Sequence, residues 1–140
     1  MDVLILAAGL GTRMEELTQD LPKPLLPVQG KPLLEYAFNL IQPLKPNQIY
    51  VNTHYHAKLI DSYIKKNYEN IHVSWEPEIL GTGGGIKKIH QNDLLVLNTD
   101  NIWTSQFTQE IELAWQYFQN HQHIDNLLLT RRTSKSFDLE

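Results

Sequence analysis

Residues 2–14 read DVLILAAGLGTRM: an aliphatic run is ended by two glycines and followed by an arginine. A continuous apolar run of this kind is typical of a strand that is buried on both faces of a parallel sheet. Glycine has no Cβ, so the backbone at Gly9 and Gly11 can lie close to a bulky ligand. We therefore expect a strand over residues 2–8 that ends in a turn shaped for an anion.

A lysine between two prolines follows this turn. Lys23 lies ten residues after Arg13, in the stretch PKPLLPV (residues 22–28). The prolines restrict the backbone around Lys23, and the two cations supply positive charge. Together with the glycines, this spacing predicts a binding site for a polyphosphate.

The two standard nucleotide motifs are absent. Met14 stands where the dinucleotide fingerprint requires its third glycine, and residues 30–32 (GKP) lack the Ser or Thr that ends an ATP-type phosphate loop. A glycine pair after a strand is also common in ordinary tight turns. The joint spacing of residues 9–13 and 22–28 favours phosphate binding over that alternative.

The rest of the chain alternates between aliphatic runs and amphipathic segments. Pro32 opens a stretch with helical spacing over residues 33–41, and Pro43 is expected to end that helix. We expect further helices over residues 59–64, 82–90 and 107–118, and strands over residues 2–8, 49–52, 71–75, 94–97 and 124–129. This alternation predicts an α/β fold with a mostly parallel open sheet and helices on both faces. Ligands bind beyond the carboxyl ends of such strands, so residues 9–13 and 98–100 should face one crevice.

The composition is that of an ordinary globular domain. The sequence has 140 residues, 41% hydrophobic and 20% charged, with a formal net charge of −4, and it predicts one domain over residues 1–140. The negative charge and the lack of a basic stripe argue against a nucleic-acid partner. There is no cysteine, which excludes disulfides and cysteine metal sites. The apolar run after Asp2 is too short for a signal peptide or membrane helix, so we expect a cytoplasmic protein without a membrane partner.

The motif LAAGLGTRM (residues 6–14), followed by PKPLLPVQGKPLLEY (residues 22–36), resembles the sugar-1-phosphate nucleotidyltransferases. TGGGI (residues 82–86) and NTDNIW (residues 98–103) extend the resemblance over most of the chain. Within the family, the motifs look most similar to N-acetylmuramate 1-phosphate uridylyltransferases and, next, to mannose-1-phosphate guanylyltransferases. The resemblance implies a Rossmann-like nucleotidyltransferase fold. It also implies an enzyme that joins a nucleoside triphosphate (NTP) to a sugar 1-phosphate and releases pyrophosphate.

The resemblance favours UTP and N-acetylmuramate 1-phosphate as substrates, with Mg²⁺ as cofactor. Two alternatives stay open: guanylyl or cytidylyl transfer to mannose 1-phosphate or phosphocholine, and a nucleotide-binding relative that regulates rather than catalyses. Family members continue well beyond 140 residues, so we expect the C-terminal part of the family fold to be missing. On that expectation the chain binds a triphosphate with Mg²⁺ weakly and turns over poorly. The sequence predicts no oligomeric state.

The resemblance also assigns the residues of the site. Arg13 is expected to hold the leaving phosphates and Lys23 to lie near the α-phosphate, so these two cations are the catalytic candidates. Asp100 is the candidate Mg²⁺ ligand, although an aspartate after a strand is also a common turn former or helix cap. Asn98 is the candidate contact to the sugar or ribose. The expected nucleotide-binding residues are Leu6, Ala8, Gly9, Gly11, Thr12, Arg13, Lys23, Glu76, Gly81 and Thr82.

Two positions depart from the family pattern. Many relatives carry glutamine where Glu76 stands, and an ionised glutamate only accepts hydrogen bonds, which is compatible with the ring N–H of uracil. Thr99 replaces the usual glycine before the metal-binding aspartate and is expected to narrow the site. The glycines at 83–85 predict a close approach of the backbone to a flat or anionic ligand, with the backbone around Gly81 reading the base.

Two histidine pairs with alternate spacing carry a weaker signal. His54 and His56 follow one strand, and His121 and His123 follow a helix. No carboxylate stands at matching spacing, so we expect surface or capping roles rather than a metal site. His54, at the end of its strand, is also placed near the expected sugar pocket. No serine or cysteine stands beside a base in a pattern that predicts a covalent nucleophile.

Overall fold

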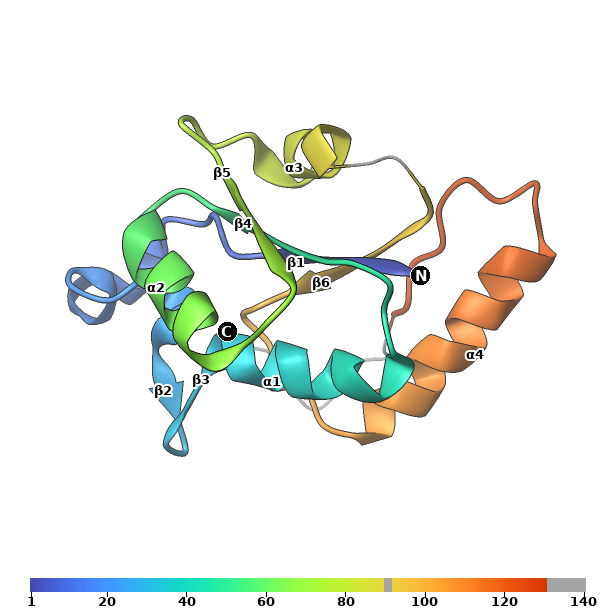
Figure 1. Ribbon diagram of the computed structural model, residues 1–140, viewed down its shortest axis with the longest axis horizontal. Coiled ribbons are helices and arrows are strands. Elements are labelled where there is room, and N and C mark those ends of the chain that lie inside the picture. Colours follow the sequence, from blue (N-terminus) through green and yellow to red (C-terminus); the bar gives the residue numbers. More distant parts are fainter. Residues whose placement is uncertain (90–91, 131–140) are drawn as a thin grey trace, which may run out of the picture.

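The computed structural model describes residues 1–89 and 92–130. Its main sheet has four parallel strands in the order β5-β4-β1-β6, with β1 in the interior (Figure 1). The strands are β1 (Asp2–Leu6), β4 (Ile49–Thr53), β5 (Ile71–Trp75) and β6 (Leu94–Asn98). The predicted parallel α/β sheet is confirmed.

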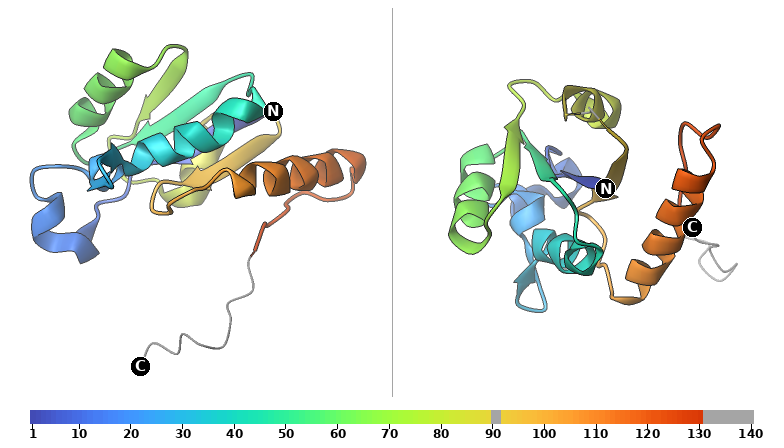
Figure 2. Two further views of the ribbon diagram at one scale, coloured as in Figure 1. Left: turned by 90° about the horizontal axis from the view of Figure 1, so that it is seen from below. Right: turned by 45° about the vertical axis from the view of Figure 1, so that its right-hand side comes forward.

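Helices cover both faces of this sheet, as the sequence predicts. α1 (Leu33–Ile41), α2 (Ala57–Asn67) and α4 (Gln106–Asn120) lie on one face, and α3 (Gly81–Ile89) lies on the other (Figures 1 and 2). The chain crosses from β1 to β4 and β5 through α1 and α2, and returns to β6 through α3. Right-handed crossovers change face when the direction of travel across the sheet reverses. No helix within residues 1–89 and 92–130 is long and apolar enough to cross a membrane.

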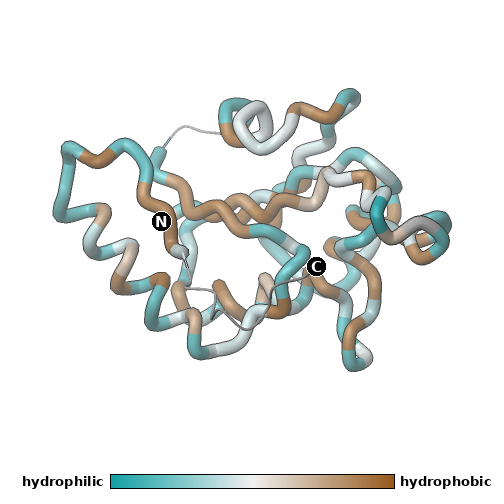
Figure 3. The backbone as a smooth tube through the Cα atoms, turned by 180° about the vertical axis from the view of Figure 1, so that it is seen from behind, coloured by the Kyte–Doolittle hydropathy of each residue, from teal (hydrophilic) through white to brown (hydrophobic). Residues whose placement is uncertain are grey.

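The hydrophobic core lies mainly between β1 and α1. Val3 and Ile5 of β1 are fully buried in one cluster with Leu34 and Ile41 of α1. Leu4 is equally buried and faces the opposite side of the sheet, because side chains alternate along a strand. The middle of the sheet is mostly hydrophobic in Figure 3, whereas the helices alternate between apolar and polar positions. Burial on both faces explains the uninterrupted aliphatic sequence of β1.

The boundaries of α1 agree with the prolines that flank it. Pro32 is the N-cap residue, and the helix ends at Ile41. A 3₁₀ turn, η3 (Gln42–Leu44), follows and contains Pro43. Proline has no N–H to donate inside a helix, so α-helical hydrogen bonding stops there.

Short elements fill the connection between β1 and α1. They are the 3₁₀ helices η1 (Thr12–Thr18) and η2 (Lys23–Leu25), and a small antiparallel hairpin of β2 (Pro27–Val28) and β3 (Lys31–Pro32). Gln29 and Gly30 form the turn with positive φ angles, which suits a two-residue hairpin loop. The Tyr36 hydroxyl donates to the Val28 carbonyl oxygen at 2.8 Å and ties the hairpin to α1. Two-residue strands carry no alternating pattern, so sequence analysis missed this hairpin.

The strand expected over residues 124–129 is wrong. α4 ends at Asn120, and residues 124–129 form no strand. Three leucines in this stretch are exposed, Leu128 by 84%. A strand needs a neighbour that satisfies its backbone N–H and C=O groups, and among the described residues this segment pairs with none. The aliphatic run alone was therefore not sufficient to form the predicted element.

The strand order also determines where a crevice opens. β1 lies between β4 and β6, and the chain reverses its direction across the sheet at this point. Leu6, the last residue of β1, is in register with Asn52 of β4 and with Asn98 of β6. In doubly wound sheets, ligands bind outside the carboxyl ends of the strands at such a reversal. The carboxyl ends of β1, β4 and β6 thus lie side by side at one edge of the sheet, where the glycine motif after β1 and the motif at residues 98–103 begin.

Two tyrosines pack where α2 approaches α1. The ring centroids of Tyr68 and Phe38 are 4.3 Å apart, and the Tyr63 hydroxyl donates to Glu35 Oε2 at 3.2 Å. Burial raises the pKa of both Tyr63 and Tyr68 above the ordinary value of 10.0. The folded state therefore keeps these protons at a pH where the unfolded chain has already lost them.

We expect the free energy of unfolding to fall as the pH rises above about 10, because the unfolded chain loses its tyrosine protons first. Below that pH both states are protonated, and the contribution of the two phenols is complete. Urea unfolding at about pH 8 and about pH 11 should show a smaller decrease for Tyr68→Phe than for the wild type. Tyr117→Phe, which changes an exposed tyrosine of α4, should keep the wild-type decrease. An undiminished decrease in Tyr68→Phe would contradict this account.

Candidate functional site

A cleft of about 390 Å³ opens at the carboxyl ends of β1, β4 and β6. Its walls come from the turn after β1, from η2, from the start of α3 and from the segment after β6. The lining residues are Leu6, Ala7, Ala8, Gly9, Gly11, Thr12, Arg13, Met14, Lys23, Pro24, Asn52, Ile79, Gly81, Thr82, Asn98, Thr99 and Asp100. This set contains every predicted site residue except Glu76. The residues that the sequence analysis selected from distant motifs are thus neighbours in space.

The glycine turn after β1 forms one wall of the cleft. Gly11 has a φ of 68°, and its carbonyl oxygen accepts a hydrogen bond from the Thr18 hydroxyl at 3.1 Å. A Cβ at Gly11 would lie 2.9 Å from Thr18 Cγ2, whereas a Cβ at Gly9 would meet nothing within 4 Å. Gly11 is therefore required by the fold of the turn itself. Gly9 keeps the wall of the cleft free of a side chain.

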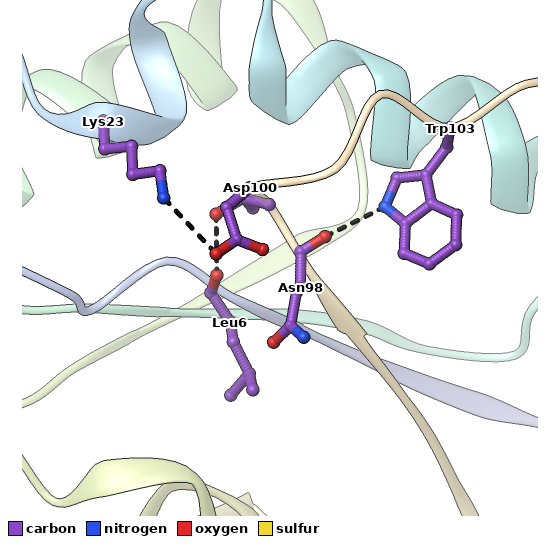
Figure 4. Close-up of polar contacts among 6 residues, drawn as sticks. Leu6, Lys23, Asn98, Asp100 and Trp103 are labelled. Carbon is purple, nitrogen blue, oxygen red and sulfur yellow. Dashed lines mark hydrogen bonds and ion pairs between the residues drawn. The ribbon is translucent and has the colours of Figure 1, made fainter. Parts of the chain in front are cut away.

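A lysine and an aspartate from distant parts of the chain meet at the cleft. Lys23 Nζ in η2 lies 3.3 Å from Asp100 Oδ2, just after β6 (Figure 4). The two side chains remain 30% and 51% exposed, respectively, so both are accessible from the solvent. An exposed ion pair of this kind contributes at most about 1 kcal/mol to stability. Both groups can therefore exchange this partner for a ligand at little cost.

Hydrogen bonds fix the end of β6 beside the end of β1. The Thr99 hydroxyl donates to the Leu6 carbonyl oxygen at 2.8 Å, and the Trp103 indole N–H donates to the Asn98 carbonyl oxygen at 2.9 Å (Figure 4). Thr99 is 95% buried, so its side chain joins the two strand ends. Asp100 follows directly and is held at the mouth of the cleft.

The donor set around Asp100 fits a magnesium ion carried by a phosphate ligand. Mg²⁺ is usually held by one or two carboxylates together with waters and phosphate oxygens, rather than by a cage of protein ligands. Asp100 supplies an accessible carboxylate to the same cleft that the glycine turn lines. Within residues 1–89 and 92–130, no three His, Cys, Asp or Glu side chains gather into a metal cage. The cleft is therefore compatible with Mg²⁺ bound together with a polyphosphate.

Asn52 is a cleft residue that sequence analysis missed. Its Oδ1 accepts a hydrogen bond from the Ala7 N–H at 2.8 Å, and its Nδ2 donates to Glu76 Oε1 at 2.9 Å. Glu76 is fully buried and does not line the cleft; its Oε2 accepts from the Leu80 N–H at 3.1 Å. A direct contact between Glu76 and a nucleotide stays a prediction, and in this structure its carboxylate is bound to the protein instead. The signal for Asn52 was a polar residue at the end of a buried strand, as at Asn98.

A family profile described as nucleotidyl transferase matches residues 2–135. The chain belongs to the nucleotidyl transferase family. The match includes the glycine turn, Lys23 and Asp100, which are the parts that meet in the cleft.

Two characterised family members show how far the similarity extends. D-glycero-alpha-D-manno-heptose 1-phosphate guanylyltransferase from Aneurinibacillus thermoaerophilus is 33% identical over 109 residues, which are 74% of this chain and 47% of that protein. N-acetylmuramate alpha-1-phosphate uridylyltransferase from Caulobacter vibrioides is 36% identical over 110 residues, or 71% of this chain and 46% of that protein. The chain thus spans about half the length of these two curated relatives.

A solved structure is also similar to this chain over about half of its own length. The crystal structure of HddC from Yersinia pseudotuberculosis complexed with GMP-PN matches with a TM-score of 0.61 and 36% identity. The match covers 81% of this chain and 53% of that one. The expected nucleotidyltransferase fold is therefore confirmed for the part of the family fold that this chain represents.

His54, His56 and His121 make capping and loop contacts in the part of the chain that the structure describes. His54 Nδ1 lies 2.9 Å from the Glu76 carbonyl oxygen, and His56 Nε2 lies 3.0 Å from that of Gln19. His121, just after α4, places Nδ1 2.7 Å from the carbonyl oxygen of Tyr117. His54 is not among the residues that line the cleft, so this cleft gives it no contact with a sugar. These contacts agree with the expected surface and capping roles.

The two glycines of the turn should respond differently to alanine. Gly11→Ala forces a side chain into the left-handed region and against Thr18, so we expect a loss of unfolding free energy of about 1–2 kcal/mol or more. Gly9→Ala places its methyl group in open space and should leave the stability nearly unchanged. Urea unfolding of the two variants measures this difference. Equal stability losses would show that Gly11 is not the constrained position.

Proposed function

We propose that the chain carries the nucleotide-binding part of a sugar-1-phosphate nucleotidyltransferase. In this reaction an NTP and a sugar 1-phosphate form a nucleotide sugar and pyrophosphate. The observation that carries the proposal is the meeting of the glycine turn, Lys23 and Asp100 in one cleft. A bare backbone wall, a cation and a carboxylate are the groups needed to hold a metal-bound triphosphate.

The reaction requires mainly that the protein positions the two substrates and stabilises the negative charge that develops on the phosphoryl oxygens. An oxygen of the sugar phosphate attacks the α-phosphorus of the NTP and forms a new P–O bond. The bond from that phosphorus to the oxygen bridging to the β-phosphorus breaks, and pyrophosphate leaves with the electron pair. Negative charge accumulates on the phosphoryl oxygens in the transition state, so preorganised cations accelerate this step.

We assign each part of the cleft to one part of the substrates. The turn from Gly9 to Thr12 lies against the triphosphate, and Arg13 neutralises the departing β- and γ-phosphates. Lys23 lies near the α-phosphate, where the two phosphate groups meet. Gly81 and Thr82, at the start of α3, form the wall against the base and ribose. Asn98, at the end of β6, contacts the sugar or ribose.

Asp100 is the residue that would hold Mg²⁺. When bound, the ion would neutralise phosphate charge and orient the triphosphate. In the structure Asp100 is paired with Lys23, so a positive charge already stands beside the carboxylate. Replacement of that partner by a metal ion would free the ammonium group of Lys23 to bind a phosphate.

The first substrate pair we propose is UTP with N-acetylmuramate 1-phosphate. It rests on the motif resemblance and on the 36% identity to the Caulobacter vibrioides uridylyltransferase. The second pair is GTP with a heptose 1-phosphate. Two observations support it: the 33% identity to the Aneurinibacillus thermoaerophilus guanylyltransferase and the 36% identity to HddC, whose crystal structure holds GMP-PN. We propose a cytoplasmic location for this reaction, since nucleotide sugars are made from soluble NTPs.

A thermal-shift series with UTP, GTP, CTP and dTTP tests nucleotide binding. We expect the matching NTP with Mg²⁺ to raise the melting temperature by about 5–11 °C at about 100 times its Kd. Removal of Mg²⁺ with EDTA should reduce the shift, because Asp100 then repels the triphosphate. The same small shift for all four NTPs, with or without Mg²⁺, would contradict the proposal.

Pyrophosphate release separates an enzyme from a nucleotide-binding relative without turnover. With the NTP that binds, and with N-acetylmuramate 1-phosphate or a heptose 1-phosphate as acceptor, we expect release that depends on both substrates. Lys23→Ala should reduce the rate about 100-fold or more, because charge at the α-phosphate is no longer neutralised. Lys31→Ala, which removes an exposed lysine outside the cleft, is the matched control and should keep the rate. Undiminished release by Lys23→Ala would remove Lys23 from the mechanism.

A further inference from the structure

A buried chain of hydrogen bonds runs beneath the cleft. The Ala7 N–H donates to Asn52 Oδ1 at 2.8 Å, Asn52 Nδ2 donates to Glu76 Oε1 at 2.9 Å, and the Leu80 N–H donates to Glu76 Oε2 at 3.1 Å. Asn52 is 3% exposed and Glu76 is 0% exposed. Bonds between buried polar groups are strong because no water competes for them. The Asn52–Glu76 pair is thus a fixed element of the structure.

This pair connects the two sides of the cleft. Ala7 belongs to the wall that continues into the glycine turn, whereas Leu80 directly precedes Gly81, which lines the wall that leads into α3. Glu76 is itself held through its backbone, since its N–H donates to the Thr53 carbonyl oxygen at 2.7 Å. The separation of the two walls therefore depends on the length and polarity of the Asn52–Glu76 link.

The glycine triplet at the start of α3 fits against this link. A Cβ at Gly85 would lie 3.0 Å from Asn52 Nδ2 and 3.2 Å from Glu76 Oε1. A Cβ at Gly84 would lie 2.7 Å from Leu80 Cβ. The close approach that the glycines permit is therefore to protein side chains. In this structure neither of these two glycines lines the cleft.

We propose that Asn52 and Glu76 are positioning residues that set the distance between the phosphate-binding turn and the wall formed by residues 79–82. This inference rests on the proposed function, because it assigns these two walls to the triphosphate and to the nucleoside. Glu76 acts through Asn52 and through the Leu80 N–H, without touching the ligand. The pair therefore determines how well a complete NTP binds, and not how well a bare polyphosphate binds.

The polarity of the link explains why a carboxylate is needed at position 76. Both neighbours of Glu76 are donors, the Asn52 amide nitrogen and the Leu80 N–H. In Glu76→Gln one side-chain oxygen becomes an NH₂ group. The amide of Asn52 and the new amide at position 76 can each be flipped, but every combination leaves one N–H donor facing another N–H donor. In Asn52→Asp two carboxylates face each other instead. Each single substitution therefore disfavours the chain of hydrogen bonds that runs through positions 52 and 76.

The double variant again places a donor opposite an acceptor in all three hydrogen bonds of the link. With Asn52→Asp and Glu76→Gln together, the Ala7 N–H still donates to a carboxylate oxygen and the Leu80 N–H to an amide oxygen. The middle bond simply reverses, since the new amide at position 76 donates to the new carboxylate at position 52. The net charge of the chain is also unchanged. A rescue by the double variant would identify the link as the origin of the effect, and the comparison of an NTP with a bare polyphosphate separates a positioning role from a general loss of stability.

The test measures the affinities for the best-binding NTP and for inorganic tripolyphosphate by titration calorimetry. We expect each single variant to bind the NTP about 10-fold more weakly and tripolyphosphate within about 2-fold of the wild type. The double variant should return to within about 3-fold of the wild-type NTP affinity. Unchanged NTP affinity in both single variants, equal losses for both ligands, or a double variant as weak as the singles would each overturn the positioning role. If the wild type binds tripolyphosphate but no NTP, or binds neither, the proposed function itself fails.

A milder pair of variants decides the question if the single variants do not fold. Gly85→Ala pushes a methyl group against Asn52 and Glu76, whereas Gly83→Ala places one in open space in the same helix. Alanine raises helix propensity at both positions by a similar amount. We expect Gly85→Ala to weaken NTP binding selectively, by about 3-fold or more, and Gly83→Ala to leave it unchanged. Equal NTP affinities in the two alanine variants would overturn the proposal.

Discussion

The structure depends on the hydrogen bonds that the backbone of β1 makes at its carboxyl end, where its pairing with the neighbouring strands stops. Leu6 is in parallel register with Asn52 on one side and Asn98 on the other. At this level the strand ladder ends, and side chains take over its hydrogen bonds: the Ala7 N–H is bound by Asn52 and the Leu6 carbonyl oxygen by Thr99. Buried backbone groups require such partners. The same contacts that satisfy the end of β1 therefore fix the floor and walls of the cleft.

This constraint explains the chemistry of the cleft. With β1, β4 and β6 joined at one level, the glycine turn and Asp100 line the same cleft, and η2 brings Lys23 to 3.3 Å from that carboxylate. Lys23 and Asp100 stand at the accessible surface, whereas the hydrogen-bonded side chains of Asn52, Glu76 and Thr99 are buried. Membership of the nucleotidyl transferase family connects this arrangement with phosphate chemistry. The matched part of the chain spans about half the length of the guanylyltransferase and uridylyltransferase relatives.

Much of the fold could be predicted from the sequence, because β1 and α1 have patterns that local physics determines. The aliphatic run at the start and the prolines at 32 and 43 mark these elements without reference to the rest of the chain. The segment 124–129 has a similar aliphatic pattern, yet it forms no strand, since strand formation depends on a partner that the pattern does not reveal. The β2–β3 hairpin was missed for the opposite reason: the turn at Gln29 and Gly30 fixes it, and its strands are too short to show a period.

The meeting of Arg13, Lys23 and Asp100 in one cleft could be predicted from residue type and spacing, and their roles toward a ligand stay predictions. It was not predictable which candidate residues are bound by other groups of the protein. The carboxylate of Glu76 accepts hydrogen bonds from Asn52 and the Leu80 N–H, and its contact with a nucleotide stays a prediction. The glycines at 84 and 85 looked like a ligand cradle, but side chains of the protein occupy the space beside them. Such roles depend on which strands become neighbours, and that information is not local in the sequence.

The central claim is that the turn after β1 encloses the phosphates of a nucleotide. Amide chemical-shift mapping by ¹⁵N NMR tests it most directly, because glycine amides are easily recognised and the chain has only seven glycines. On addition of Mg²⁺ and the best-binding NTP, we expect large shifts for the amides of Gly9 and Gly11. Gly30, in the hairpin turn outside the cleft, should stay unchanged. Saturable NTP binding that leaves Gly9 and Gly11 unshifted would contradict the account.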